Sequence, residues 1–361
     1  MFDAGSSSTN GRTYLALPST RNPRWLLPLS SRRCLWRGLD LYTPYRTLGH
    51  VKKQLLRLAA TAACAGLPVK KIRIPFDELE KLVRDILGVK EVVLAFSFGT
   101  PGKYRKATVQ VMHLDGVVAG YLKLPLTEAA LERVRRECAT LETLARCPKL
   151  RNRIPRLLHA GWSGQTYVLF QTGLPGKPGS TRFGVHHQTF LEGLSQARRT
   201  VKMGDAVVGL VASEVRDTLP RMGTEWQQLG VEMLEWADQW LTGRFVECGI
   251  THGDFAPWNT REDGHLFCFD WESARTDVPC CWDEFHFQTQ VSALLKTSTT
   301  LDLDSPTRPA LYGLYLLSSA CKLYDEGGEV QRGIDFRRQR VQQLLLEMPW
   351  TPVRRHSRVA A

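Results

Sequence analysis

The chain has little that would place it in a membrane, in an oxidising compartment or around zinc. Its longest uncharged apolar stretch, Pro309 to Cys321, is far shorter than the roughly 20 residues that a bilayer-crossing helix needs, and its first residues include no signal-peptide core. Its nine cysteines form no C-x-x-C pair, and Cys280 and Cys281 are adjacent and poorly placed to bridge each other. We therefore expect a cytoplasmic protein with free thiols and no zinc site.

Positive charge is concentrated at the start of the chain. Residues 1–73 hold thirteen Lys or Arg against Asp3 and Asp40, and the rest is almost balanced within a total net charge of +12. Such a segment is suited to an anionic membrane surface, a glycan or nucleic acid, and it is equally compatible with a solvated arm. It matches no nucleic-acid recognition module, so we do not expect nucleic acid as the partner.

The hydrophobic pattern predicts an α+β protein in three parts. The first, residues 1–90, is a basic extension that is disordered over 1–11, with strands at 14–17 and 25–28 and helices at 51–65 and 77–87. In the second, residues 91–172, strands at 91–97, 107–114, 117–124, 156–162 and 166–171 surround a helix at 127–146. Asp115-Gly116 predicts a tight hairpin between the second and third of these strands.

The third part, residues 173–361, is mostly helical. It begins with a Gly- and Pro-rich stretch at 173–179 that favours a hinge. Helices are expected at 185–219 (one or two), 225–248, 282–295, 309–325 and 333–346. The exception is 250–272, where a loop, a turn and an apolar strand at 266–269 interrupt the helices.

That exception carries the sharpest motif. Thr251-His252-Gly253-Asp254-Phe255-Ala256-Pro257-Trp258-Asn259 places Asp254 and Asn259 at the D-x-x-x-x-N spacing of a kinase catalytic loop, and Asp270 follows eleven residues after Asn259. Phosphoryl transfer needs one carboxylate to orient the acceptor hydroxyl and take its proton, which suits Asp254. It also needs oxygen ligands for Mg²⁺, a role that suits Asn259 and Asp270. A purely structural origin of all three residues is the weaker interpretation.

The motif resembles that of the aminoglycoside phosphotransferase and choline kinase family, which has the protein-kinase-like fold. That family reads H-x-D-x-x-x-x-N and later an Asp before an aromatic and an acidic residue, as in Asp270-Trp271-Glu272. The resemblance covers the chain from about Glu91 onward. It implies a bilobal fold, with a five-stranded antiparallel N-lobe and a helical C-lobe, and it implies ATP and Mg²⁺ as cofactors.

The resemblance also implies residues that bind the nucleotide. Lys123 matches the phosphate-binding lysine of the third strand; Glu137 and Glu142 both flank the following helix's apolar stripe, and the family pattern favours Glu137 as its partner. Backbone at Gly99 and Gly102 is the candidate phosphate loop. Thr172 and Leu174 lie in the expected hinge and should face the adenine.

These observations predict an ATP-dependent phosphotransferase that acts on a hydroxyl of a small molecule or saccharide. Gly253 and Asp270-Trp271-Glu272 depart from the protein-kinase pattern, which favours such an acceptor over a protein. The alternative is a weak or inactive nucleotide-binding regulator or scaffold that docks through its basic N-terminal segment. The sequence leaves the acceptor, the nucleotide base and the oligomeric state open.

Overall fold

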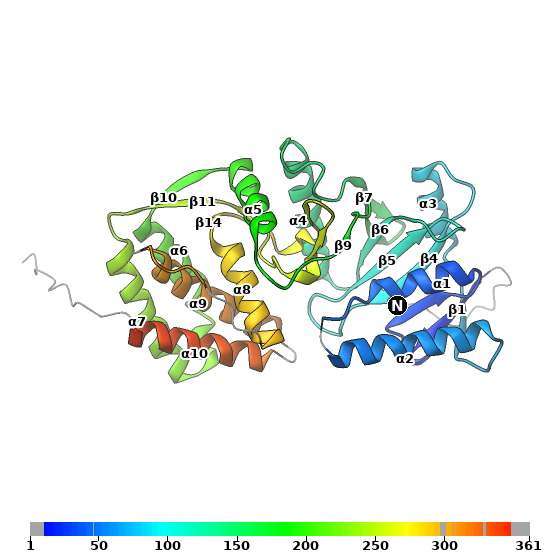
Figure 1. Ribbon diagram of the computed structural model, residues 1–361, viewed down its shortest axis with the longest axis horizontal. Helices are drawn as coiled ribbons and strands as arrows, with labels where there is room; N and C mark the ends of the chain where they lie inside the picture. The colour runs from blue at the N-terminus through cyan, green and yellow to red at the C-terminus, as the bar shows by residue number, and fades with distance from the viewer. Residues whose placement is uncertain (1–10, 46, 297–300, 306, 328–329, 348–361) are drawn as a thin grey trace, which may run out of the picture. The chain divides into compact units, whose positions relative to one another are not determined.

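The computed structural model describes residues 11–45, 47–296, 301–305, 307–327 and 330–347 (Figure 1). The chain forms two compact units. Unit 1 comprises Met1–Ser180 and Pro257–Ser273, and unit 2 comprises Thr181–Ala256 and Ala274–Ala361. The predicted disorder of residues 1–11 falls almost entirely outside the described residues. Among the described helices, none combines the length and the apolar character that crossing a bilayer requires.

Unit 1 is built on one antiparallel sheet of eight strands in the order β3-β1-β2-β4-β5-β6-β8-β7. The strands are β1 (Arg12–Leu17), β2 (Trp25–Pro28), β3 (Lys71–Ile74), β4 (Val93–Phe98), β5 (Lys106–Met112), β6 (Val118–Pro125), β7 (Leu157–Ser163) and β8 (Thr166–Gln171). The predicted α+β class is confirmed. The predicted number of five strands is wrong, because β2 pairs with β4 and so joins three strands of the N-terminal segment to the five expected ones.

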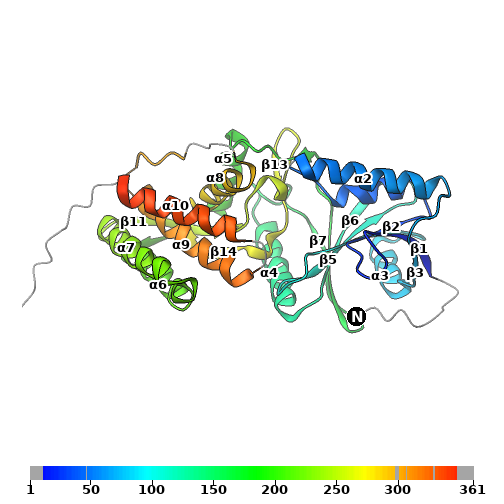
Figure 2. The ribbon, with the colours of Figure 1, turned by 90° about the horizontal axis from the view of Figure 1, so that it is seen from below.

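Helices cover both faces of this sheet. They are α1 (Arg32–Gly38), α2 (Thr47–Cys64), α3 (Asp77–Leu87) and α4 (Glu128–Ala145), and a short 3-10 turn, η1 (Leu39–Leu41), follows α1. Figure 2 shows α2 on one face of β1 and β2 and α3 on the other, and α1 packs on the same face as α2. The strands alternate accordingly, since Val93 and Ala95 of β4 pack with α1 and α2, whereas Leu94 and Phe96 pack on the α3 side.

A small second sheet completes unit 1. It consists of β9 (Lys177–Pro178), β12 (Thr260–Glu262) and β13 (Leu266–Cys268), with the 3-10 turns η3 (Pro257–Asn259) and η4 (Trp271–Ser273) at its ends. β9 lies within the Gly- and Pro-rich stretch at 173–179, so the expectation that this whole stretch lacks regular structure is wrong at these two residues. Gly179 lies so close to β12 that an added Cβ would sit 1.9 Å from Thr260 Oγ1, so the approach requires glycine.

Unit 2 is mostly helical around a three-stranded sheet in the order β10-β11-β14. Its elements are α5 (Val185–Ala197), β10 (Thr200–Met203), α6 (Gly204–Val215), η2 (Leu219–Met222), α7 (Thr224–Leu241), β11 (Phe245–Thr251), β14 (Arg275–Pro279), α8 (Trp282–Leu295), α9 (Arg308–Glu326) and α10 (Gln331–Glu347). Met233, Trp236, Tyr312 and Leu316 lie at the centre of its core.

Two helix predictions in unit 2 are wrong in extent. The helix expected at 225–248 ends at Leu241, because Gly243 takes a positive φ of 73° and the following apolar residues form β11 instead. The helical stretch expected at 185–219 is interrupted by β10, whose four residues pair with β11. Short apolar runs of this kind fit a buried strand as well as a helix.

Candidate active site

Lys123 is the centre of a buried ion cluster in unit 1. Its Nζ lies 2.6 and 2.5 Å from the two carboxylate oxygens of Glu137 and 2.5 Å from Oδ1 of Asp270. The Lys123 side chain is 5% exposed and that of Glu137 is fully buried. Glu142, the other candidate partner, is exposed on α4.

Local structure explains why these side chains meet. In β6, Leu122 and Leu124 face the α3 side of the sheet, so Lys123 between them points to the opposite face, where α4 packs. Glu137 also accepts the backbone N–H of Trp271 at 3.3 Å, which ties α4 to the residue after Asp270.

The β12–β13 hairpin brings Asn259 and Asp270 to one end of the small sheet. Thr260 pairs with Cys268, and the Phe269 N–H donates to the Asn259 carbonyl at 3.0 Å. Asp270 follows with a φ of 70°, which is unusual for a residue other than glycine and costs on the order of 1 kcal/mol or more. Asp270 is thus held in place by the contacts around it.

Lys106 and Glu272 belong to the same cluster, although neither is among the site residues predicted from the sequence. Lys106 Nζ lies 2.8 Å from Asp270 Oδ1 and also pairs with Glu272. Arg133 of α4 lies 3.8 Å from the other Glu272 oxygen. The hairpin register contained the signal for Lys106, because Thr108 pairs with Lys123 and Lys106 with Pro125, which puts both lysines on one face.

The charges within the cluster stabilise one another. Burial alone would raise the pKa of Asp270, but the ammonium groups of Lys106 and Lys123 outweigh it and hold that pKa well below its ordinary range. Burial would lower the pKa of Lys106, and the carboxylates of Asp270, Glu272 and Glu137 raise it instead. Both groups are therefore charged at neutral pH.

The oxygen atoms of this cluster have the chemistry of a hard-cation site. Among the described residues, carboxylate oxygens of Glu137, Asp270 and Glu272 all lie within 4.8 Å of one another. Mg²⁺ prefers such ligands. Asp270 belongs both to this cluster and to the pair of Mg²⁺ ligands, Asn259 and Asp270, that the sequence predicts. Asn259 lies across the hairpin from Phe269, the residue before Asp270.

Asp254 lies in unit 2, at the end of β11, where α8 and α9 position it. His286 of α8 places Nε2 3.0 Å from Asp254 Oδ1, and the Tyr315 hydroxyl lies 3.1 Å from the other ring nitrogen. If Tyr315 donates to Nδ1, then Nε2 carries the proton and donates it to Asp254. The Asp254 side chain keeps 37% of its surface exposed, so it is fixed and still accessible.

A second carboxylate, Asp283, holds the backbone of the same loop. Its two oxygens accept the N–H groups of His252 at 2.6 Å and Gly253 at 2.9 Å, and Lys322 donates to the Gly253 carbonyl at 3.1 Å. Gly253 has a φ of 73°, which a residue with a side chain rarely adopts. The loop before Asp254 is therefore fixed by backbone contacts.

Burial and charge set the pKa values around Asp254. Burial raises the pKa of Asp254, but the hydrogen bond and charge of His286, with Lys322, outweigh it and lower that pKa overall. Burial lowers the pKa of His286 despite the Asp254 charge. Burial raises the pKa of Asp283 to about 7, although the hydrogen bonds from the two backbone N–H groups favour a lower pKa.

The predicted nucleotide-binding backbone is found at the ends of strands in unit 1. The Gly99 N–H donates to the Lys106 carbonyl at 2.9 Å and closes the loop between β4 and β5, while Gly102 has open space around its Cα. The Thr172 N–H donates to the Arg156 carbonyl at 3.0 Å. Of the two predicted hinge residues, Thr172 therefore already uses its N–H in a backbone hydrogen bond. The other, Leu174, follows two residues later in the chain.

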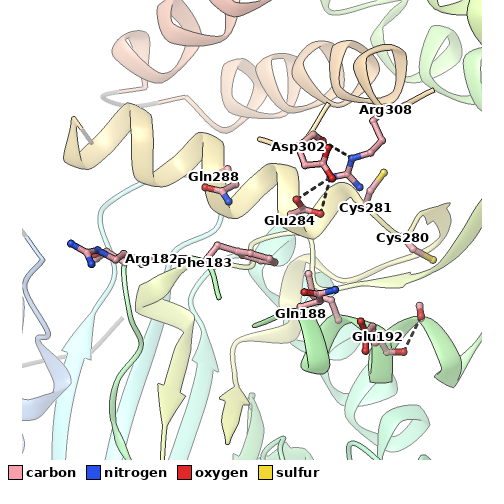
Figure 3. Close-up of a pocket in the computed structure, with 13 residues that line it drawn as sticks. Arg182, Phe183, Gln188, Glu192, Cys280, Cys281, Glu284, Gln288, Asp302 and Arg308 are labelled. Carbon is pink, nitrogen blue, oxygen red and sulfur yellow. Dashed lines mark hydrogen bonds and ion pairs between the residues drawn. The ribbon is translucent and has the colours of Figure 1, made fainter. Parts of the chain in front are cut away.

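Unit 2 also contains a polar hollow of about 1090 Å³ between α5, α8 and the residues before α9 (Figure 3). Its walls include Glu284 and Gln288, one turn apart on α8, and Arg308, which makes two 2.9 Å contacts to Glu284. His286 lies between these positions on α8 and points to another side of the helix. The hollow is therefore separate from the Asp254 carboxylate.

No protein-family model matches the chain, and no curated protein matches it. Solved structures do. A mutant aminoglycoside 2'-phosphotransferase in complex with GDP is 14% identical, with a TM-score of 0.48, over 75% of this chain and 98% of that one. A choline kinase from Cryptosporidium parvum Iowa II is 7% identical, with a TM-score of 0.49, over 76% and 95%. A putative fructosamine-3-kinase from Haemophilus somnus 129PT is 12% identical, with a TM-score of 0.47, over 74% and 96%.

These likenesses concern the path of the chain. At identities of 7–14% and TM-scores of 0.47–0.49, they do not establish the chemistry of this chain, which depends on its own side chains.

Proposed function

We propose that this protein is a Mg-ATP-dependent phosphotransferase that phosphorylates a hydroxyl group of a small molecule or saccharide. The observation that carries the proposal is the Lys123 ammonium, which bridges Glu137 and Asp270 in a buried cluster. A lysine fixed by a helix glutamate beside a metal-binding aspartate is what phosphate positioning requires. The similar structures are those of phosphotransferases and kinases of small molecules, which agrees with this proposal.

The residues of unit 1 would hold the nucleotide and its cation. Lys123 would contact the phosphates, and Asn259 and Asp270 would bind Mg²⁺, with Glu272 able to support them. When bound, Mg-ATP supplies the phosphoryl group and the cation that neutralises its charge. Lys106 pairs with the carboxylates of Asp270 and Glu272, so on cation binding it would have to share these carboxylates with the ion or release them.

Asp254 would act on the acceptor. Its lowered pKa keeps it ionised at neutral pH, and the His286 contact leaves part of the carboxylate exposed. An ionised carboxylate in this state can accept a hydrogen bond from an acceptor hydroxyl, orient it and take its proton as the bond to phosphorus forms. His286 positions Asp254 and is itself held by Tyr315.

Acceptor-dependent release of ADP tests the proposal. The purified chain is incubated with Mg-ATP and a panel of sugars, amino alcohols and aminoglycosides. We expect at least one acceptor to stimulate ADP release, and we expect Asp254→Ala to abolish it while nucleotide binding and the thermal melt are retained. A matched control is Asp263→Ala, an exposed acid in the β12–β13 turn. Binding of Mg-ATP without turnover on any acceptor would support the regulator or scaffold instead.

A further inference from the structure

Helix α2 has a second apolar face that points away from the sheet of unit 1. Its inner face, with Leu56 and Ala60, is buried against the sheet. Four other apolar side chains recur at spacings of three and four and are largely exposed: Leu48 (84%), Val51 (54%), Leu55 (60%) and Leu58 (65%). We call these four residues the α2 stripe. Positions three and four apart lie on one side of a helix, so the stripe is one continuous surface.

Basic side chains accompany this stripe. Helix α1 packs beside α2 on the same face of the sheet. The described residues of these two helices carry six basic side chains: Arg32, Arg33, Arg37, Lys52, Lys53 and Arg57. The acids nearby are Asp40, which pairs with Arg37 and Lys53 at 3.5 Å, and Asp115 in the hairpin that contacts α1. Lys53 is mostly buried and, with Arg37, pairs with Asp40, so the cationic excess of these two helices comes mainly from Arg32, Arg33, Lys52 and Arg57.

We propose that the α2 stripe and the arginines of α1 form a docking surface for an anionic lipid bilayer. Exposed apolar side chains gain by entering the acyl boundary, and the flanking cations gain by meeting anionic headgroups. A glycan or nucleic acid would match the charge but leave four large apolar side chains in water. A two-fold contact with a second copy would set the cations of one face against those of the other.

The docking surface is joined to the candidate active site within unit 1. Tyr45, two residues before α2, donates its hydroxyl to the Pro257 carbonyl at 2.8 Å, and its ring meets Trp258 edge to face. Pro257 and Trp258 directly precede Asn259. Docking through α2 would therefore hold the segment that carries Asn259 near the bilayer. The inference does not depend on the proposed function, because lipid binding is measured without turnover.

Vesicle flotation of the full chain tests the inference. The two compositions are phosphatidylcholine alone and phosphatidylcholine with roughly 30 mol% phosphatidylglycerol, each at about 0.1 M and about 0.5 M NaCl. We expect binding to the anionic vesicles, weakened at high salt. Both Leu55→Gln/Leu58→Gln and Arg32→Gln/Arg33→Gln/Arg37→Gln should lower it by roughly tenfold or more.

Matched controls lie on α10 of unit 2. Leu346 is 86% exposed and Arg332 is exposed, so Leu346→Gln and Arg332→Gln remove one leucine and one arginine of the same kind elsewhere. Circular dichroism and a thermal melt verify that every variant is folded. Equal binding to both vesicle types, no binding to either, or an unchanged Leu55→Gln/Leu58→Gln variant would overturn the inference. So would a dimer in sedimentation that the leucine variant dissociates, since the stripe would then be a protein interface.

Discussion

Lys106 and Asp270 form an ion pair, with Nζ 2.8 Å from Oδ1, although they lie 164 residues apart in the sequence. Lys106 also pairs with Glu272. An ammonium group thus neutralises the two carboxylates that are best suited to a magnesium ion. Cation binding and the Lys106 ion pairs should compete for the same oxygen atoms.

Replacing Lys106 should strengthen Mg²⁺ binding in the absence of nucleotide. Lys106→Met leaves Asp270 with Lys123 alone and Glu272 with Arg133 at 3.8 Å, so less positive charge opposes the incoming ion. We expect the Mg²⁺ concentration that half-saturates the rise in melting temperature to fall by roughly tenfold, the effect of about 1.4 kcal/mol. Lys103→Met, on the exposed loop nearby, should leave it unchanged. Identical titrations for wild type and Lys106→Met would contradict the competition.

Removing Lys123 should have separable structural and functional effects. Lys123→Met strands the fully buried Glu137 without its partner and should cost about 3 kcal/mol or more of unfolding free energy, measured by denaturant titration. Lys123→Met/Glu137→Leu removes both charges, so most of this stability should return. Nucleotide binding should not return with it. Recovery of nucleotide affinity in the double variant would show that the lysine has only a structural role.

The acid limb of the activity profile should depend on His286. In His286→Leu, Asp254 stays partly buried but loses the hydrogen bond that lowers its pKa, so that pKa should rise. Activity requires the ionised carboxylate, and the limb should therefore move to higher pH, with the optimal rate reduced roughly tenfold or more. His265→Leu, which removes an exposed histidine in the β12–β13 turn, serves as the control. If the acid limb of the His286→Leu profile lies at the same pH as that of wild type, His286 does not position Asp254 in this way.

Asp283 should make the stability of the fold depend on pH. Its pKa is about 7 in the folded chain against an ordinary value of 3.8, so between these values the folded state holds a proton that the unfolded state has released. This contribution stabilises the protein at low pH and is lost as the pH rises through 7. The Asp283→Asn variant lacks it.

The measurement is the difference in unfolding free energy between wild type and Asp283→Asn. From about pH 5 to about pH 8, wild type should lose about 2–3 kcal/mol relative to the variant. The comparison cancels other titrating groups, including His286, whose lowered pKa acts with the opposite sign below pH 6.5. A constant difference over this range would mean that Asp283 stays ionised.

Much of the sheet could be predicted from local pattern. The strands β4 to β8 lie close to their predicted ranges. The two-residue turn expected at Asp115-Gly116 is wrong in register, because the His113 N–H donates to the Val117 carbonyl, Met112 pairs with Val118, and the pairing shifts between Val111 and Met112. Helix α3 was predicted at its observed bounds, because acidic residues begin it and Gly88 ends it in the left-handed conformation. The β2–β4 pairing could not be predicted, since it joins strands more than 60 residues apart that carry no mutual signal.

For the candidate site, the sequence by itself determined the spacing of Asp254, Asn259 and Asp270, because all three residues lie on one loop and the hairpin that directly follows it. Only the tertiary structure decided that Glu137 rather than Glu142 reaches Lys123, that Lys106 joins Asp270, and that Asp283 and His286 hold the loop of Asp254. These contacts depend on how elements distant in sequence pack. Helical periodicity predicts which face of a helix a residue lies on. Only the tertiary packing determines which residues of other elements lie opposite that face.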